Sequence, residues 1–425
     1  VNRAIEEGVD IIGLSGLITP SLEEMVKVAT EMQERNLNIP LLIGGATTSK
    51  VHTAVKITPN YEGPVIYVPD ASRAVTVAEK MLGGDSKAYH DTVLEEYERI
   101  RAHHELHNAT KRMVPIEMAR KNKLMLDFSK DNIVKPTQLG IFDGKIDVET
   151  LIPYIDWSPF FRSWDLHGKY PEILTDSVVG VEATKLLDDA RMCLSDGIKN
   201  GWFHPTYVYG IFNANAVGDD IEIYDETKQQ VLHRSIGLRQ QIEKTSGQFN
   251  LCLSDYIAPK ESGIEDYIGC FAVTSGDVTN ICKQFEAAHD DYSSIMIKAV
   301  ADRLAEALAE WLHERVRHTH WGYDKTPLKN EDLIAEKYIG IRPAPGYPAC
   351  PDHYEKLGIF NVLKATERIG VSLTESLAMH PASSVSGWYF AHPSAKYFGI
   401  TAILEDQFLS VCERRNVNKD EHISW

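Results

Sequence analysis

The sequence predicts a chain that combines α/β and α+β architecture, and two observations support this. The first 83 residues alternate short apolar runs with amphipathic stretches, which is typical of parallel βα units. From about residue 131 the pattern changes to longer apolar runs mixed with helical periodicity, which favours an α+β domain with an antiparallel sheet. The expected domains are residues 1–84, a helical linker over 85–130, and residues 131–425.

Three apolar runs are the expected strands of the first region, namely residues 10–18, 39–44 and 64–68. Ser21 is expected to cap a helix that runs to about Asn36, with Glu24 completing a capping box. Further helices are expected from about Lys50 and after Ser72. A doubly wound (Rossmann-like) sheet usually has five or six strands, so this region is expected to be an N-terminally incomplete sheet.

The linker and the second region have their own patterns. Residues 85–130 are charged with a thin apolar stripe, and the histidines at 103, 104 and 107 point apart on such a helix, so no metal site is expected there. Strands are expected at 207–212, 220–224 and 267–273, followed by a pair, 385–391 and 396–402, around a turn at 392–395. The longest helix is expected over 294–318, with a buried stripe of Met296, Ile297, Val300, Leu304, Leu308 and Trp311. This stripe places Asp302 and Glu306 on the opposite face, where the simplest role is a solvated acidic surface.

Composition excludes several classes of function. The 425 residues are 43% hydrophobic and 25% charged, as in ordinary globular proteins, and the net charge is −17. Such an acidic chain is a poor partner for nucleic acid or for an anionic membrane, because both attract basic surfaces. Six cysteines without metal-ligand spacing indicate reduced thiols in a cytoplasmic protein, which we expect to be a monomer. No apolar run is long enough to span a membrane.

Candidate ligand-binding residues follow the first two expected strands. Ser15 and Thr19 follow the first strand, and Gly44 and Gly45 follow the second. Ligands of open α/β sheets bind at the carboxyl ends of strands, and paired glycines allow a bulky group to approach the backbone. The alternative is that these Ser, Thr and Gly residues serve capping and turns alone.

A second candidate is the loop of residues 341–353, where four prolines surround Gly346. Proline fixes φ and glycine permits a turn closed to other residues, so Arg342 and Tyr347 project from a rigid loop that loses little entropy on binding. The planar fork of Arg342 suits a carboxylate or a phosphate. The alternative is a proline-rich surface turn with a solvated arginine.

The first region resembles the cobalamin-binding domain of the cobalamin-dependent methionine synthase family, through V-D-I-I-G-L-S-G-L-I-T-P-S-L-E-E-M and I-P-L-L-I-G-G-A-T-T-S-K-V-H. The resemblance implies that Ser15 and Thr19 face the dimethylbenzimidazole tail, that Gly44 and Gly45 line its channel, and that Ala71 closes the pocket. The family's D-x-H-x-x-G motif, which supplies the lower cobalt ligand, is expected upstream of residue 1. The near match at Asp165–Tyr170 has Tyr where the motif needs Gly, so no cobalt ligand is assigned to it.

The second region resembles the activation domain of the same family. The matching segments are Y-I-D-W-S-P-F-F (154–161), G-D-D-I-E-I-Y (218–224), H-D-D-Y (289–292), A-D-R-L-A-E-A (301–307), R-P-A-P-G-Y-P-A-C-P (342–351) and S-V-S-G-W-Y-F (384–390). That domain binds S-adenosylmethionine, so the resemblance implies that Arg342 holds its carboxylate and Asp156 its ammonium, with Tyr397 and Phe398 in contact. The alternatives are that Asp156 only caps a turn and that the aromatic pair belongs to the core.

Three further residues gain roles from the resemblance. Tyr347 matches the tyrosine that meets the corrin when the two domains pack together. Asp302 and Glu306 match acidic positions that face the cobalamin domain, where one can hold the displaced histidine. An acidic partner favours the imidazolium over the cobalt-bound form.

The function implied is that of a methionine synthase, which transfers a methyl group from methyltetrahydrofolate to homocysteine through cobalamin. This portion would carry out reductive remethylation of cob(II)alamin to methylcobalamin, with an electron from flavodoxin or a flavoprotein reductase. Homocysteine and folate modules would lie upstream in the same enzyme. Two alternatives stay open. A free-standing S-adenosylmethionine methyltransferase would turn over without corrinoid, and a non-catalytic corrinoid carrier would leave Arg342 and Asp156 without a role.

Overall fold

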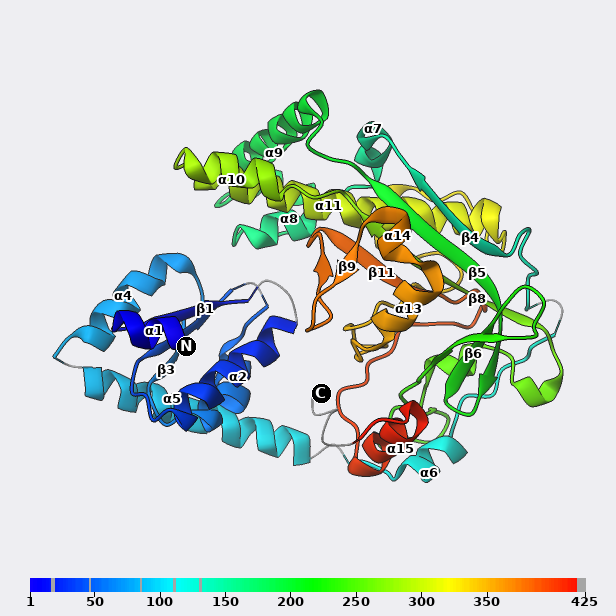
Figure 1. Ribbon diagram of the computed structural model, residues 1–425, viewed down its shortest axis with the longest axis horizontal. Helices are drawn as coiled ribbons and strands as arrows, with labels where there is room; N and C mark the ends of the chain where they lie inside the picture. Colours follow the sequence, from blue (N-terminus) through cyan, green and yellow to red (C-terminus); the bar gives the residue numbers. More distant parts are fainter. Residues whose placement is uncertain (17–19, 46, 85, 110–111, 130–131, 419–425) are drawn as a thin grey trace. The chain divides into compact units, whose positions relative to one another are not determined.

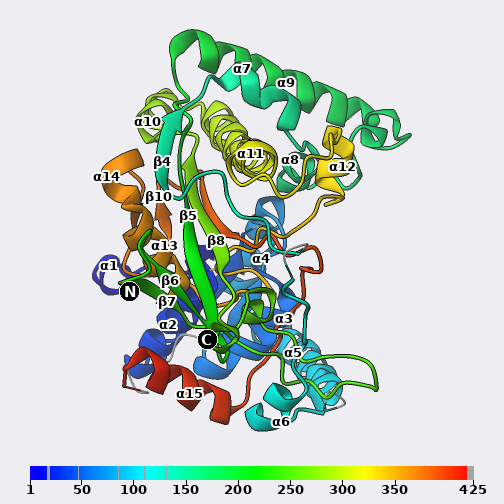
Figure 2. The same cartoon turned by 90° about the vertical axis from the view of Figure 1, so that its right-hand side faces the viewer.

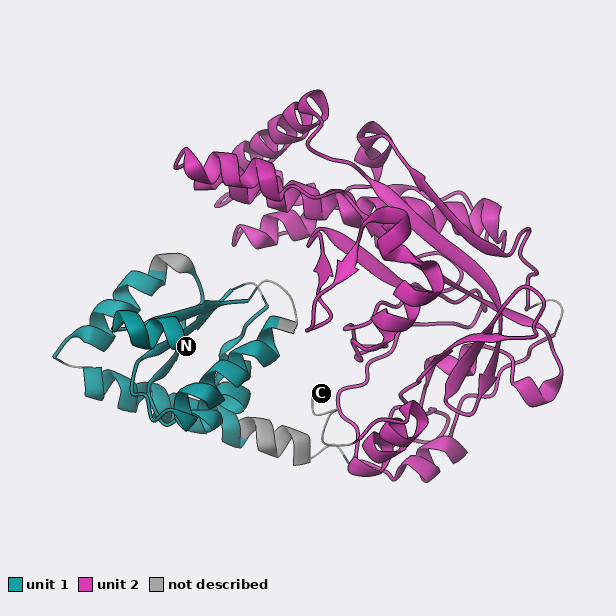
Figure 3. Cartoon of the chain, viewed as in Figure 1, with its two compact units in different colours: residues 1–112, 424 teal, residues 113–423, 425 magenta. Residues whose placement is uncertain are grey.

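The computed structural model of the chain describes residues 1–16, 20–45, 47–84, 86–109, 112–129 and 132–418 (Figure 1). The chain forms two compact units, residues 1–112 and the residues from 113 onward (Figure 3). The domain boundaries expected at residues 84 and 130 stay a prediction. Within the described residues, no helix is both long enough and apolar enough to cross a membrane.

The first unit is built on a parallel sheet of three strands in the order β1-β2-β3, as predicted. Leu41 and Ile43 of β2 pack on one face with α2, whereas Leu42 packs on the other face with α4. This alternation covers both faces of the sheet, as parallel sheets require. The elements are α1 (Asn2–Glu7), β1 (Ile12–Ser15), α2 (Pro20–Glu34), β2 (Leu41–Gly44), α3 (Lys50–His52), a π-turn (Thr53–Ile57), a 3-10 turn (Thr58–Asn60), β3 (Val65–Tyr67), α4 (Ala71–Leu82) and α5 (Ser86–Ala109).

The helix starts of this unit follow local capping chemistry, with one correction. Helix α2 begins at Pro20, so Ser21 lies inside the first turn and its predicted capping role is wrong. Proline suits this position because the first N–H groups of a helix have no partner within the helix. The hydroxyl of Ser49 accepts from the His52 N–H before α3, and the Asp70 carboxylate accepts from the Arg73 N–H before α4.

Helix α5, expected as part of a linker, packs against the first unit along its first four turns. The Tyr67 N–H donates to the hydroxyl of Tyr97, which is 1% exposed. Arg101 Nη1 donates to the Ala54 carbonyl at 2.9 Å, and the side chains of Lys50 and Glu96 form an ion pair at 2.8 Å. The side chains of residues 103–109, including the three histidines, lie outside the described residues.

The second unit is built on an antiparallel sheet in which β5 is central. The strand order is β11-β8-β5-β6-β7, and β4 also pairs with β5. The strands are β4 (Gly140–Lys145), β5 (Thr206–Val217), β6 (Asp220–Tyr224), β7 (Val231–Ser235), β8 (Asp266–Thr274) and β11 (Ser384–Tyr389), with a separate hairpin of β9 (Ser372–Leu373) and β10 (Met379–His380).

One predicted strand is absent: residues 396–402 form no strand, although the partner expected for them, β11, is present. Strand β11 pairs with β8 instead, with Trp388 opposite Cys270. The hydrogen bonds of the 396–402 segment go elsewhere. The Ile400 N–H donates to the Pro348 carbonyl, and the side chain of Gln240 donates to the Gly399 carbonyl.

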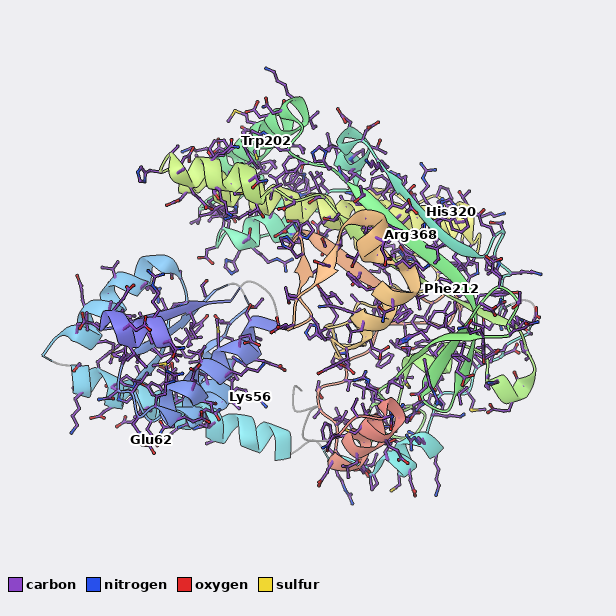
Figure 4. The ribbon with its side chains drawn as sticks, viewed as in Figure 1. Lys56, Glu62, Trp202, Phe212, His320 and Arg368 are labelled. Atoms are coloured by element: carbon purple, nitrogen blue, oxygen red, sulfur yellow. The ribbon has the colours of Figure 1, made fainter. Side chains whose placement is uncertain are left out.

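Two layers of helices cover the sheet (Figure 2). Tyr209 of β5 faces α9 and α11 and contacts the His320 ring with centroids 4.9 Å apart, whereas Phe212 packs on the opposite face beside Leu363 of α13 (Figure 4). The helices are α6 (Ile116–Lys121), α7 (Val148–Leu151), α8 (Ser158–Ser163), α9 (Gly180–Asn200), α10 (Thr279–Ala287), α11 (Asp291–Arg315), α12 (Asn330–Ile334), α13 (Glu355–Leu363), α14 (Ala365–Ile369) and α15 (Glu405–Arg415).

Helix α11 is the longest helix predicted from the sequence, and it begins and ends three residues earlier than expected. Five of the six predicted stripe residues are buried, and Trp311 is partly buried. A π-turn, Val316–His320, continues the helix. Since α11 packs centrally against the sheet, its polar residues Asp302, Glu306 and Glu310 are partly buried, whereas Asp291, Lys298 and Arg315 are exposed.

Candidate functional site

The proline-rich loop is held along β11, the strand at one end of the sheet. The Trp388 N–H donates to the Pro343 carbonyl at 2.9 Å, and Ile341 and Phe390 form a β-bridge. Gly346 has φ of +95°, and a Cβ atom there would lie 2.2 Å from the His353 ring. Only glycine therefore fits this turn, as predicted, while the rigidity of the loop stays a prediction.

Arg342 enters the interior from this loop. Its side chain is 16% exposed, and its Nη2 lies 3.1 Å from Glu310 Oε2 of α11. Its guanidinium lies over the Phe271 ring, 5.9 Å from the ring centroid, and its main-chain N–H donates to the Tyr397 hydroxyl at 2.9 Å. Nη1 is buried and has no hydrogen-bond partner among the described residues. One arm of the guanidinium is thus held, and the other is buried without a hydrogen-bond partner in the described chain.

Charges around Arg342 keep it ionised. Burial lowers the pKa of its guanidinium, but Glu310 and Tyr338 raise it, and the net direction is upward. Burial raises the pKa of Glu310, whereas Arg342 and Arg317 oppose this effect. Because Arg342 stays charged, it can recognise a carboxylate or a phosphate.

A buried polar cluster lies behind this pair. His313 is fully buried, its Nδ1 is 4.0 Å from Glu310 Oε1, and its Nε2 is 3.2 Å from the Tyr323 hydroxyl. Burial, together with Arg342 and Arg317, holds the pKa of His313 well below its usual value, so the ring is neutral. Arg317 lies over the Tyr338 ring at 4.5 Å, and none of its guanidinium nitrogens has a hydrogen bond within the described chain.

Asp156 precedes α8 and is half-buried. Its Oδ1 accepts from the Ser158 N–H at 2.9 Å, so this carboxylate caps the turn that starts α8. The neighbouring Tyr154 donates to Glu314 of α11. Helix α11 therefore contacts both the segment of Asp156 and the loop of Arg342, while the ammonium-binding role of Asp156 stays a prediction.

The predicted aromatic pair divides between two environments. Tyr397 contacts the main chain of Arg342 through its hydroxyl, and its side chain is 38% exposed. Phe398 packs beside the Tyr256 ring, with centroids 6.4 Å apart, and against two apolar clusters. Tyr397 thus lies at the candidate site, whereas Phe398 has a core role; ligand contact by either residue stays a prediction.

Asp302 and Glu306 are half-buried, so neither side chain is fully solvated, and their role toward a cobalamin domain stays a prediction. The Ser383 hydroxyl donates to Asp302 Oδ1 at 2.6 Å. Burial raises the pKa of Asp302, Ser383 and Arg303 oppose this effect, and Glu306 adds to it. Tyr347 is 61% exposed. The pKa of its hydroxyl is raised, mainly by the partial burial of that group and to a smaller extent by the negative charge of Glu306. The structure therefore brings these three predicted residues together.

In the first unit, Ser15 is exposed at the end of β1 and lies opposite Gly44 of β2. Gly45 has φ of +108°, and a Cβ atom there would lie 2.3 Å from the main chain of Gly16. Close contact between neighbouring strand ends thus explains this glycine without a ligand. Thr19 and the side chain of Ala71 lie outside the described residues. No group of potential metal ligands occurs in the part of the chain that the structure describes.

Sequence reasoning missed Glu310, although the sequence contains a signal for it. Acidic residues recur every four positions along α11, at Asp302, Glu306, Glu310 and Glu314. Residues four apart share a helix face, so a stripe that begins at Asp302 predicts further members. The partners of Glu310 come from distant segments, and no local pattern indicates them.

The second unit is an α+β domain that holds a half-satisfied arginine in its interior, an arrangement suited to a small anionic or zwitterionic ligand. Residues 147–416 match the model of the vitamin B12 dependent methionine synthase activation domain, and the chain belongs to this family. It is also similar to a crystal structure of the MetH reactivation domain bound to AdoHcy, with 51% sequence identity and a TM-score of 0.71. The similarity covers 73% of this chain and 96% of that chain. The predicted fold class and the predicted function as a reactivation portion of a methyltransferase are thereby confirmed.

Proposed function

We propose that the Arg342 site binds S-adenosylmethionine and that its methyl group serves reductive remethylation of cob(II)alamin. The observation that carries this proposal concerns the two terminal nitrogens of Arg342. Nη2 pairs with Glu310, whereas Nη1 is buried and has no hydrogen-bond partner among the described residues. A ligand carboxylate would accept from this arm in a charge-assisted hydrogen bond. AdoHcy, bound in the similar crystal structure, is what S-adenosylmethionine becomes when it loses its methyl group.

Asp156 would accept from the ammonium of the same ligand. Its Oδ1 already accepts from Ser158, but a carboxylate has about four lone-pair sites and can take further donors. Tyr397 would contact the ligand next to Arg342, and Phe398 would support this contact from the core. A zwitterionic end group then meets one protein group of each sign.

Residues of the first unit would bind cobalamin, and Asp302 and Glu306 of the second unit would act on its displaced histidine ligand. Ser15 is exposed at the end of β1, and its hydroxyl would contact the nucleotide tail of the cofactor, with Gly44 and Gly45 lining the channel beside it. Thr19 and Ala71 would complete that site. In the second unit, Tyr347 would face the corrin, and Asp302 or Glu306 would hold the displaced histidine as a cation. When bound, the cofactor supplies the nucleophile, while the protein supplies position and control of ligation.

The partners follow from the same proposal. Flavodoxin or a flavoprotein reductase would supply the electron, and homocysteine and folate modules of the same enzyme would perform methionine synthesis. The six cysteines are free thiols, which supports a reducing, cytoplasmic location.

Calorimetry with S-adenosylhomocysteine tests the binding site. Removing one partner of a buried, hydrogen-bonded charge pair costs roughly 2 to 5 kcal/mol, so Arg342→Ala should weaken binding by about 30-fold or more. Arg342→Lys should restore it only in part, because an ammonium lacks the fork. Arg368, which pairs with Asp143 at the surface (Figure 4), provides the matched control, and Arg368→Ala should bind normally. Unchanged affinity in a folded Arg342→Ala variant would exclude Arg342 from the site.

Anaerobic spectroscopy tests the reaction. With cob(II)alamin, reductant and S-adenosylmethionine, the proposed function predicts a methylated corrinoid that forms only when all three are present. A free-standing methyltransferase would instead consume S-adenosylmethionine without corrinoid. A carrier would change the corrinoid spectrum without any dependence on S-adenosylmethionine.

A further inference from the structure

Glu310 contacts the candidate ligand-binding arginine but has no assigned role. Its Oε2 lies 3.1 Å from Arg342 Nη2, and the two side chains are 13% and 16% exposed. Its Oε1 has no hydrogen-bond partner among the described residues, and the nearest ring nitrogen, Nδ1 of the neutral His313, is 4.0 Å away. The carboxylate therefore makes its one hydrogen bond to Arg342.

We infer that Glu310 is a positioning residue: it holds Nη2 of Arg342 so that Nη1 faces the carboxylate of the ligand. This inference rests on the proposed S-adenosylmethionine site. A long arginine side chain has many rotamers, and a guanidinium held at one arm loses less entropy when the other arm binds.

The surroundings hold both members of the Glu310–Arg342 pair in place. Glu310 stands on α11, where the adjacent Ala309 is fully buried, so the helix cannot shift without disturbing the core. The Tyr397 hydroxyl fixes the main chain of Arg342, and the Phe271 ring lies under its guanidinium. The direction of Nη1 is thus set before any ligand arrives.

The opposite role is also physically consistent. Glu310 could neutralise Arg342 and compete with the ligand carboxylate for it. Removal of its charge would then strengthen binding, whereas loss of a positioning contact weakens binding. The sign of the effect separates the two roles.

The test uses the full chain and two probes, S-adenosylhomocysteine and 5′-methylthioadenosine, which lacks the amino-acid end. In Glu310→Gln the amide oxygen can still reach Nη2 but is a weaker acceptor than a carboxylate, so Nη2 is held less firmly. This variant should weaken binding of S-adenosylhomocysteine by roughly 10-fold and leave 5′-methylthioadenosine unchanged, since only the first probe has a carboxylate. In the Arg342→Ala background the same substitution should have no further effect. Glu310→Asp, too short to reach Nη2, should resemble Glu310→Gln and replaces it if that variant does not fold. Glu286→Gln, which breaks an exposed ion pair with Lys298 in the same unit, is the matched control.

Each other outcome overturns the inference. Equal losses for both probes, or an undiminished loss in the Arg342→Ala background, would show a purely structural role. Tighter binding of S-adenosylhomocysteine by Glu310→Gln would show that Glu310 competes with the ligand carboxylate for Arg342. If Glu310→Gln binds normally and Arg342→Ala binds weakly, Arg342 belongs to the site but Glu310 does not position it. If the unaltered chain does not bind S-adenosylhomocysteine, the proposed function itself fails, and this inference fails with it.

Discussion

At the residue scale, Arg342 shows how far sequence reasoning reaches. The prolines and Gly346 around it are local signals that predicted a tight turn, but Arg342, expected to project from the loop, enters the interior instead. The partners of Arg342 are Glu310, 32 positions earlier, and Tyr397, 55 positions later. Such contacts depend on how the helix, the loop and the sheet pack together, so no pattern of spacing could predict them.

Asp266 is a second buried charge whose effect can be measured. It is 7% exposed, and burial raises its pKa to about 7, although its oxygens accept from the N–H groups of Ala258 and Tyr267. Since its pKa in the folded state exceeds that in the unfolded state, its stabilising contribution is complete below about pH 4 and is lost as the pH rises to about 7. A shift of roughly 3 units corresponds to at most about 4 kcal/mol.

Asp266→Asn should therefore flatten the pH dependence of stability. Urea unfolding between pH 4 and 8 should show that the free energy of unfolding of the variant increases, relative to that of the unaltered protein, as the pH rises. Asp277→Asn, at an exposed position of the same unit, should not produce this gain. Parallel stability curves for Asp266→Asn and the unaltered protein would contradict the raised pKa.

Gly45 offers a prediction for the first unit. Its φ of +108° and the 2.3 Å approach to Gly16 make any side chain unfavourable. Gly45→Ala should cost more than about 1 kcal/mol of stability. Gly13→Ala, on β1 with no atom within 4 Å of the added Cβ, is the control and should cost less. Thermal unfolding compares them, and equal melting temperatures would show that the strand ends separate freely.

At the scale of elements, long apolar segments were predicted well, including β11 at the end of the sheet, whereas two strands of mixed polarity and one irregular segment were not. The central strands β5 and β8 are long, mostly buried runs, and α11 has a clear stripe of apolar residues, so all three give strong signals in the sequence. Two strands, β4 and β7, were not predicted, and each has a single partner strand in the described sheet. Their sequences are G-I-F-D-G-K and V-L-H-R-S, which mix polar with apolar residues, as expected at sheet edges. Residues 396–402 look like a strand because aromatic and β-branched residues also pack well in an irregular segment.

Helix α11 is expected to contribute strongly to the stability of the second unit. Leu304 and Leu308 are fully buried in the cluster between α9 and the sheet. Leu304→Ala should lower the free energy of unfolding by about 2 to 5 kcal/mol, because it removes contacts and leaves a cavity. Leu409→Ala, at a leucine of α15 that is 45% exposed, should change it far less. Chemical unfolding measures both, and similar losses for the two variants would contradict a tightly packed α11.

At the scale of the whole molecule, the Arg342 site belongs to one unit. Asp156, Glu310, Arg342 and Tyr397 all lie beyond residue 113, and the family match spans residues 147–416. Binding of S-adenosylhomocysteine should therefore not require the first unit. The helix α6 is part of the second unit as well, since the Ile116 N–H donates to Asp406 and Arg120 pairs with Asp219 at 2.7 Å.

We expect a chain that begins at residue 113 to fold and to bind S-adenosylhomocysteine within about twofold of the full chain. A shorter chain that begins at residue 131 removes α6 and leaves Asp219, whose side chain is 2% exposed, without one of its two arginines. This chain should be less stable, because a buried carboxylate that loses a partner is costly. Calorimetry and thermal unfolding of the two chains measure both effects. If the chain from residue 113 is folded but does not bind, the first unit contributes to the site, and the assignment of Arg342 and its neighbours as a self-sufficient ligand site is wrong.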